Sequence, residues 1–188
     1  MNNTKKPLLF IHGGGEGAYD ADGKLVASLQ DALGAEYNVR YPKMPNEERP
    51  EYEAWKDQIS KEHAALNGTV LLVGHSLGGS ILLKYLSEVT VERSIAGIFL
   101  IATPYWGAEE WQVDEYALRE DFASQLPKVT PIFLYHSRDD EVVPFAHLAM
   151  YAEKLPHATI REFDGRGHRF NDDLSEIAAD ITSLQERE

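Results

Sequence analysis

Short runs of apolar residues alternate with amphipathic stretches along most of this 188-residue chain. The runs are mostly continuous rather than alternating, which is typical of strands whose two faces are both covered by helices. The expected strands span 7–11, 37–41, 69–73, 95–101, 131–135 and 159–163. The expected helices span 22–33, 51–65, 77–88, 144–154 and 172–186. This alternation predicts an α/β fold, a three-layer α/β/α sandwich around a mostly parallel sheet of about six strands.

The amphipathic stretches carry the features of helices that pack on such a sheet. Leu174, Ile177, Ile181 and Leu184 recur at a spacing of three and four residues and form one apolar face. Pro144 suits the first turn of its expected helix, where no N–H group is needed. No repeat, linker or low-complexity tract divides the sequence, so we expect one domain over residues 1–188.

The residue types used in chemistry gather in loops that follow the expected strands. In a parallel sheet these loops meet at one edge, beyond the carboxyl ends of the strands. The loop after the first strand reads His-Gly-Gly-Gly (12–15), and the third strand runs into Gly-His-Ser-Leu-Gly (74–78). The fifth strand is followed by Asp139 and Asp140, and the sixth by His168. A serine, an acid and a histidine are therefore expected at one edge of the sheet.

The segment 74–78 is the most informative of these loops. An apolar run, then Gly-x-Ser-x-Gly, then a helix-compatible stretch predicts a strand, a sharp turn and a helix. Ser76 would lie on that turn, directly before the helix, whose free N–H groups and dipole favour negative charge. The pentapeptide alone is common enough to occur by chance as a glycine-rich turn with a capping serine, so its meaning depends on the other loops.

Composition narrows the choice of function. The formal net charge of −13 disfavours nucleic acid and anionic membranes as partners. The chain has no cysteine, which excludes disulfides, thiolate metal sites and cysteine nucleophiles. The histidines show no metal-ligand spacing, so we expect neither a metal nor a cofactor. The polar start and the short run at 8–11 do not make a signal peptide, and a cytoplasmic location is expected.

In these motifs the chain resembles the α/β-hydrolase superfamily, and in particular its small, lid-poor, esterase-like bacterial members. The matching segments are 10–14, 74–79, 140–144 and 167–168, in the family's order of nucleophile, acid and histidine. The chain opens at the strand before the oxyanion loop, so the usual first two strands are expected to be missing. The resemblance implies Ser76 as nucleophile, His168 as general base and Asp140 as orienting acid. It also implies an oxyanion hole built from the backbone N–H groups of Leu77 and Gly14.

Several assignments stay open at this stage. Gly15 is the alternative oxyanion donor, because the glycine run leaves the register ambiguous, and otherwise a pocket residue. Asp139 competes with Asp140 as the acid, and Glu109 or Glu110 are further alternatives. Asp164 is too close to His168 along the chain to orient it. His12 is expected to pin the oxyanion loop, and His75 to pack beside the serine turn at the pocket.

The segment 103–122 is the longest interruption between expected strands and a possible lid. It is rich in aromatic and acidic residues, and its aromatics could pack on the core or form a pocket wall over Ser76. Trp106 is the expected pocket residue among them. Arg138, Arg166 and Arg169 could bind a substrate carboxylate, but pairing with the abundant Asp and Glu is favoured.

The sequence therefore predicts a serine hydrolase that cleaves small carboxylic esters through an acyl-enzyme on Ser76. A small acyl compound is the expected partner. Thioesterase, amidase, lactonase or acyltransferase chemistry would use the same residues. An alternative of another class is a non-catalytic binding protein on a hydrolase fold. The sequence does not distinguish a monomer from a homodimer.

Overall fold

The computed structural model describes residues 4–185 and contains one six-stranded sheet in that range. The strands are β1 (Lys6–Ile11), β2 (Tyr37–Arg40), β3 (Val70–His75), β4 (Ile95–Ile101), β5 (Ile132–Ser137) and β6 (Thr159–Phe163). Their order across the sheet is β2-β1-β3-β4-β5-β6, and every neighbouring pair is parallel. All carboxyl ends therefore meet at one edge, as the alternating pattern predicts.

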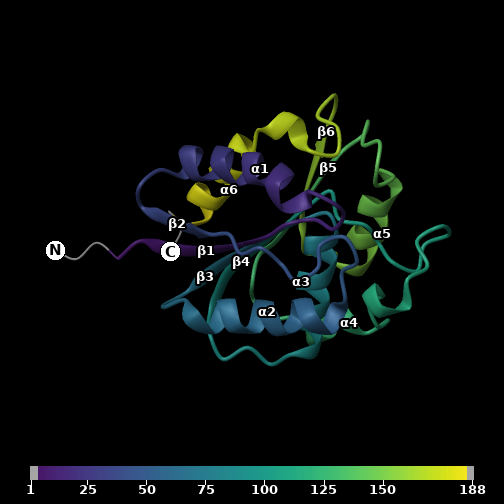
Figure 1. Ribbon diagram of the computed structural model, residues 1–188, viewed down its shortest axis with the longest axis horizontal. Coiled ribbons are helices and arrows are strands. Elements are labelled where there is room, and N and C mark those ends of the chain that lie inside the picture. The colour runs from purple at the N-terminus through teal and green to yellow at the C-terminus, as the bar shows by residue number, and fades with distance from the viewer. Residues whose placement is uncertain (1–3, 186–188) are drawn as a thin grey trace.

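Helices cover both faces of the sheet (Figure 1). Helices α1 (Ala18–Leu33) and α6 (Ser175–Gln185) pack together on one face. The other face carries α2 (Tyr52–Ala65), α3 (Leu77–Glu88), the short α4 (Phe122–Gln125) and α5 (Ala146–Lys154). The α/β/α sandwich is thereby confirmed.

Alternate residues of each central strand face the two helical layers, which explains the continuous apolar runs. In β1, Leu8 and Phe10 belong to the core under α1 and α6, whereas Leu9 and Ile11 belong to the core under α2 and α3. Full burial of each such side chain stabilises the fold by about 1.5–3 kcal/mol. The edge strand β6 is only partly buried.

The element boundaries differ from expectation at several helix ends. Helix α1 begins at Ala18 rather than at 22, after Gly17 in the left-handed region with φ 73°. Helix α5 begins at Ala146 rather than at 144, and the Pro144 carbonyl accepts a hydrogen bond from His147 N at 3.0 Å. Helix α6 begins at Ser175 rather than at 172, and the expected residue 186 lies outside the described residues.

Two short 3₁₀ turns complete the chain between these elements. One spans Asp114–Tyr116 within the segment 103–122, and the other spans Phe170–Asp172, just after His168. The second turn has positive φ values of 52–54° at all three residues, a conformation that apolar periodicity does not predict. None of the helices within residues 4–185 is long and apolar enough to cross a lipid bilayer.

Candidate active site

The serine turn joins the central strand β3 to α3 at the carboxyl edge of the sheet. Ser76 adopts φ 53° and ψ −127°, and its N–H donates to Ile101 O at 2.8 Å. Such a backbone conformation costs about 1–3 kcal/mol and persists only where the surroundings impose it. A Cβ at Gly74 would come within 2.5 Å of Gly79 Cα, and one at Gly78 within 2.3 Å of His12 O. The glycines therefore allow the close packing that holds Ser76 on the turn.

His168 and Asp140 form a hydrogen-bonded pair at the same edge. The Nδ1 atom of His168 lies 2.9 Å from Asp140 Oδ2 and 3.1 Å from Oδ1. The Asp140 side chain is fully buried and accepts hydrogen bonds from the N–H groups of Val142 and Val143, each at 2.8 Å. Burial alone would raise the pKa of Asp140, but hydrogen bonds from His136 and His168 hold it well below its usual range. Asp140 is therefore a carboxylate that orients the His168 ring.

The environment of His168 favours the neutral ring. Its side chain is 10% exposed, and burial followed by the charge of His75 lowers its pKa, against the opposing effect of Asp140. With Nδ1 on the carboxylate, Nε2 is the proton-accepting atom, and no residue within 4–185 makes a hydrogen bond to it. The chain fixes one nitrogen of His168 and leaves the other available.

The loop after β1 passes over the serine turn. A Cβ at Gly13 would lie 3.4 Å from Ser76 Cβ, and one at Gly14 would lie 2.6 Å from Leu77 Cδ2. His12 helps to hold the loop: its Nε2 accepts a hydrogen bond from Met44 N at 2.9 Å, and its Nδ1 lies 2.6 Å from Gly13 O. The expected pinning role of His12 agrees with these contacts.

The N–H groups of this loop have different partners. Gly13 N donates to Asp22 Oδ2 at 2.8 Å, and Gly15 N donates to Glu47 O at 2.7 Å. Among residues 4–185, Gly14 N has no acceptor. Leu77 is the first residue of α3, so its N–H has no acceptor within the helix. Gly14 and Leu77 therefore each carry an N–H group beside Ser76 that has no acceptor among residues 4–185, and Gly15 does not.

The other acidic candidates are engaged elsewhere. Asp139 is exposed and accepts hydrogen bonds from Ser137 Oγ at 2.5 Å and Gly167 N at 3.1 Å, which shapes the loop. Asp164 pairs with Arg138 at 3.0 Å. Glu109 and Glu110 are exposed in the segment 103–122. The carboxylate on His168 is thus Asp140.

The two remaining arginine candidates are also paired with acids. Arg166 lies 2.7 Å from Glu176, and Arg169 lies 2.9 Å from Asp172. Among residues 4–185, no three histidine, aspartate or glutamate side chains gather as they would around a metal ion. The polar residues around His168 therefore form ion pairs and hydrogen bonds with one another.

His75 is enclosed beneath the serine turn, with only 2% of its surface exposed. Its Nδ1 lies 2.8 Å from Asp22 Oδ2, and its Nε2 lies 3.0 Å from His168 O. It packs beside the turn as expected, but its burial keeps it out of a pocket wall. Sequence reasoning missed Asp22 because the helix was expected to begin there. With α1 starting at Ala18, Asp22 shares the buried face of Leu25 and Leu29, and that polar residue in an apolar face is the signal.

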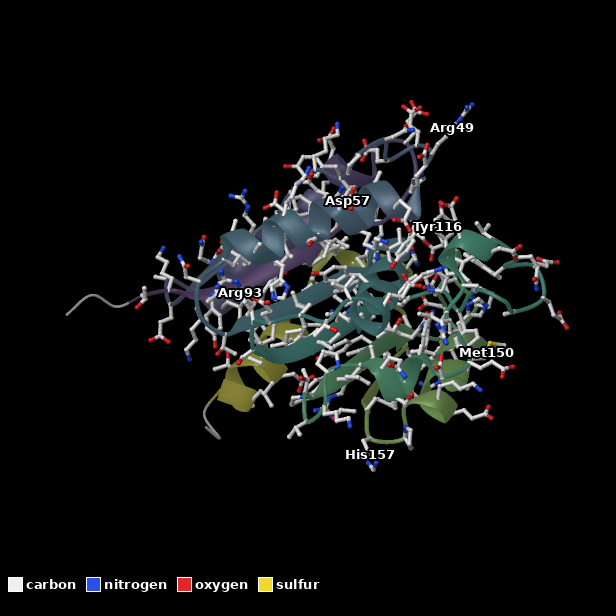
Figure 2. The ribbon with its side chains drawn as sticks, turned by 90° about the horizontal axis from the view of Figure 1, so that it is seen from below. Arg49, Asp57, Arg93, Tyr116, Met150 and His157 are labelled. Atoms are coloured by element: carbon white, nitrogen blue, oxygen red, sulfur yellow. The ribbon has the colours of Figure 1, made fainter. Side chains whose placement is uncertain are left out.

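The segment 103–122 is fastened to the loop just before α2 and to α3. The Tyr116 hydroxyl donates to Pro50 O at 2.5 Å, and Lys84 Nζ donates to the carbonyls of Glu115 and Ala117 at 2.9 and 3.0 Å. Figure 2 shows Tyr116 on the opposite side of the molecule from Arg93, which lies two residues before β4. The segment therefore rests on the helices as a docked strap.

Trp106 is half-buried within this strap. Its indole N–H donates to Ser80 Oγ on α3 at 3.1 Å. Its ring packs edge-to-face on Trp111 and Tyr116, with 5.0 Å between centroids in each case. Ser80 lies one turn along α3 from Ser76, so Trp106 lies over the beginning of that helix.

Solved structures share this architecture. The chain aligns with the meta-cleavage product hydrolase CumD of Pseudomonas fluorescens IP01 at a TM-score of 0.77 and 16% identity, over 98% of this chain and 92% of that one. It aligns with the ydeN gene product of Bacillus subtilis at a TM-score of 0.72 and 22% identity, over 97% and 100% of the two chains. The protein therefore has the α/β-hydrolase fold.

The sequence comparison defines the family within that fold. Residues 21–173 match the serine hydrolase family, and the chain belongs to it. The chain is also 26% identical to YdeN of Bacillus subtilis (strain 168), which is provisionally named a hydrolase. The alignment covers 132 residues, or 69% of each protein. The protein is thus a small serine hydrolase.

Proposed function

We propose that the protein hydrolyses small carboxylic esters through an acyl-enzyme on Ser76, with His168 as general base and Asp140 as its orienting acid. The observation that carries this proposal is the asymmetry of His168. Its Nδ1 is held by a buried carboxylate, while its Nε2 is left without a partner in residues 4–185. A ring held in this way is oriented to take a proton from a serine hydroxyl.

The reaction needs donors for the oxyanion of the tetrahedral intermediate, and Gly14 and Leu77 can supply them. Their N–H groups lie on the two segments that meet beside Ser76, and both lack an acceptor in the described part of the chain. Donors placed in advance stabilise charge that develops in the transition state, typically by about 2.7–4 kcal/mol for one donor. Ser76 attacks the carbonyl carbon, and His168 takes the hydroxyl proton and passes it to the leaving alcohol. Water, deprotonated by His168, then releases the acid.

The docked strap supports a small substrate rather than a lipid. A lipase that acts at an oil surface needs a wide apolar patch when open. The strap instead exposes Glu109, Glu110 and Asp121. It is tied to Pro50, just before α2, through Tyr116 and to α3 through Lys84. We therefore propose that short acyl chains are preferred and that no interfacial activation occurs.

Covalent labelling tests the nucleophile. A fluorophosphonate probe should label wild-type protein at Ser76, and Ser76→Ala should abolish labelling while it leaves the fold intact. Ser124→Ala is a matched control, because Ser124 is an exposed serine on α4. Labelling that survives in Ser76→Ala, or a wild-type protein that resists the probe, would refute the proposal and favour a non-catalytic binding protein.

A series of p-nitrophenyl esters with acyl chains from about two to sixteen carbons, with and without micelles, tests the substrate class. We expect the largest kcat/KM at the short end. A maximum of kcat/KM for long acyl chains, together with activation by micelles, would contradict the proposed preference for short chains. The strap would then be a lipid-facing lid. Matched thioesters, amides and lactones would distinguish the related reactions that the same residues can perform.

A further inference from the structure

A second buried histidine–carboxylate pair lies directly behind the serine turn. His75, at the end of β3, and Asp22, on α1, are 2% and 3% exposed, and His75 Nδ1 lies 2.8 Å from Asp22 Oδ2. The same carboxylate oxygen accepts a hydrogen bond from Gly13 N at 2.8 Å. The other ring nitrogen of His75 lies 3.0 Å from His168 O. The pair therefore touches the oxyanion loop, the strand before Ser76 and the His168 loop.

The partners of His75 define its protonation. A carboxylate and a main-chain carbonyl can only accept hydrogen bonds, so both Nδ1 and Nε2 of His75 must donate. A ring with two N–H groups is an imidazolium. Burial disfavours that charge, but the Asp22 carboxylate outweighs burial and raises the pKa of His75. Burial likewise acts to raise the pKa of Asp22, yet the His75 charge, the hydrogen bonds from His75 and Gly13 and the nearby Arg169 lower it. Both members of the pair are therefore charged.

We propose that Asp22 and His75 are positioning residues for the hydrolysis proposed above, on which this inference rests. Asp22 holds His75 as an imidazolium. The pair clamps Gly13 and the His168 main chain, and the imidazolium presents a positive charge to the His168 ring. The clamp on Gly13 N leaves the next N–H group, that of Gly14, beside Leu77 and without an acceptor in the part of the chain that the structure describes. The clamp on His168 O fixes the loop from which the base projects.

The charge of His75 acts on His168 at short range. The centroids of the two rings are 4.9 Å apart. The other charged groups around this point are Asp140 and Glu141 from the loop after β5, Asp22 from α1, and Arg169, whose Nη1 lies 3.6 Å from Asp22 Oδ1. The carboxylates Asp140 and Glu141 favour protonation of His168, and the imidazolium opposes it. His75 thus helps to keep the base neutral as the solution becomes mildly acidic.

The pH dependence of kcat/KM tests this role, because a merely structural pair would lower activity without moving the profile. Wild-type kcat/KM should rise with pH through the His168 transition and then level off. His75→Gln removes the cation, and Asp22→Asn removes the carboxylate that keeps His75 protonated. Both variants should move the acid limb to higher pH by about 0.5–1 unit, which is a roughly 3–10-fold loss of activity below the limb.

Matched controls separate this effect from the loss of any buried group. His63→Gln changes a buried histidine on α2, and Asp180→Asn changes a half-buried carboxylate on α6 that binds Arg161 and the Tyr135 hydroxyl. Neither should move the acid limb. The proposal would be overturned if the acid limbs of the kcat/KM profiles of His75→Gln and Asp22→Asn coincided with that of wild type.

Nitrogen-15 NMR of the histidine rings in the full chain gives a second readout that depends on neither activity nor the stability of a variant. His75 should show protons on both ring nitrogens at neutral pH, and a neutral His75 ring would overturn the proposal. The measurement also separates the two hypotheses. An active Ser76→Ala variant would refute the proposed function, whereas a neutral His75 beside an inactive Ser76→Ala would refute this inference alone.

Discussion

Two histidine–carboxylate pairs lie side by side at the carboxyl edge of the sheet, and they are arranged for different tasks. In each pair a buried aspartate contacts Nδ1 of the histidine, at 2.9 Å for Asp140 and His168 and at 2.8 Å for Asp22 and His75. The pairs differ at Nε2. In His75 this atom meets a carbonyl, and in His168 no residue within 4–185 engages it.

The difference at one nitrogen has opposite consequences for the two rings. His75 has two acceptors, so its pKa is raised although burial opposes the charge. His168 has one, and burial with the neighbouring positive charge lowers its pKa. A histidine–aspartate contact is therefore not sufficient to define a general base. The second nitrogen decides whether the ring holds the structure or can accept a proton from substrate or nucleophile.

The largest expected effect comes from removing the ring with the free nitrogen. His168→Gln should lower kcat by a factor on the order of 10³ to 10⁶, because it removes the proposed acceptor of the Ser76 proton. Activity against a short p-nitrophenyl ester, with far-UV circular dichroism to verify folding, measures this. Near-wild-type turnover by a folded His168→Gln would assign the base to another residue.

The next largest loss of activity is expected from a change at Asp140, the carboxylate that contacts His168. Asp140→Asn should reduce kcat by up to about 10⁴, since the amide no longer stabilises the imidazolium and can favour the wrong tautomer. Asp139→Asn is the adjacent control and should cost far less, because Asp139 shapes the loop from an exposed position. If the ranking of the two variants were reversed, Asp139 would be the acid.

Stability should rank the two histidines in the opposite order to activity. His75→Ala leaves Asp22 buried without its main partner, and such losses typically cost about 3–5 kcal/mol. His168→Ala leaves Asp140 with the N–H groups of Val142 and Val143, and about 1–3 kcal/mol is expected. Urea unfolding of both variants measures the comparison. Equal losses in unfolding free energy would show that the second pair contributes no more to the fold than the first.

The smallest effect is the pH dependence of stability, and its sign differs between the two rings. The His168 pKa is lowered, so the folded state loses stability as pH falls below about 6.5, where the unfolded chain binds the proton. The His75 pKa is raised, so its contribution is fully present below about 6.5 and is lost as pH rises through the folded value.

Urea unfolding of wild type, His168→Gln and His75→Gln at a series of pH values separates these contributions. The advantage of wild type over His168→Gln should shrink toward acid pH, and its advantage over His75→Gln should shrink toward alkaline pH. Each change is limited to about 1.4 kcal/mol per unit of pKa difference. Three parallel curves would mean that neither ring titrates differently in the folded and unfolded states.

The alternation of apolar runs and amphipathic stretches was sufficient to predict the sheet and its helices. The bounds of β4, β6 and α3 match the expected ranges. The errors fall where local backbone chemistry overrides periodicity. Helix α1 extends back to Gly17 because glycine takes the positive φ that starts it, and the turn at Phe170–Asp172 interrupts the expected start of α6.

By itself, the sequence determined the parallel α/β sandwich, the serine turn at residues 74–78 and the edge at which an acid and a histidine follow their strands. These features depend on periodicity and on short-range backbone geometry, which neighbouring residues encode. Tertiary structure decided which acid reaches His168, which glycine N–H lacks an acceptor among residues 4–185, and that Asp22 contacts both Gly13 and His75. Those outcomes depend on contacts between residues 28 to 93 positions apart, such as His168 with Asp140, Asp22 with His75, and His75 with the His168 carbonyl. Only the folded sheet brings these groups within hydrogen-bonding distance. It also excludes the water that would otherwise screen the electrostatic interactions between them.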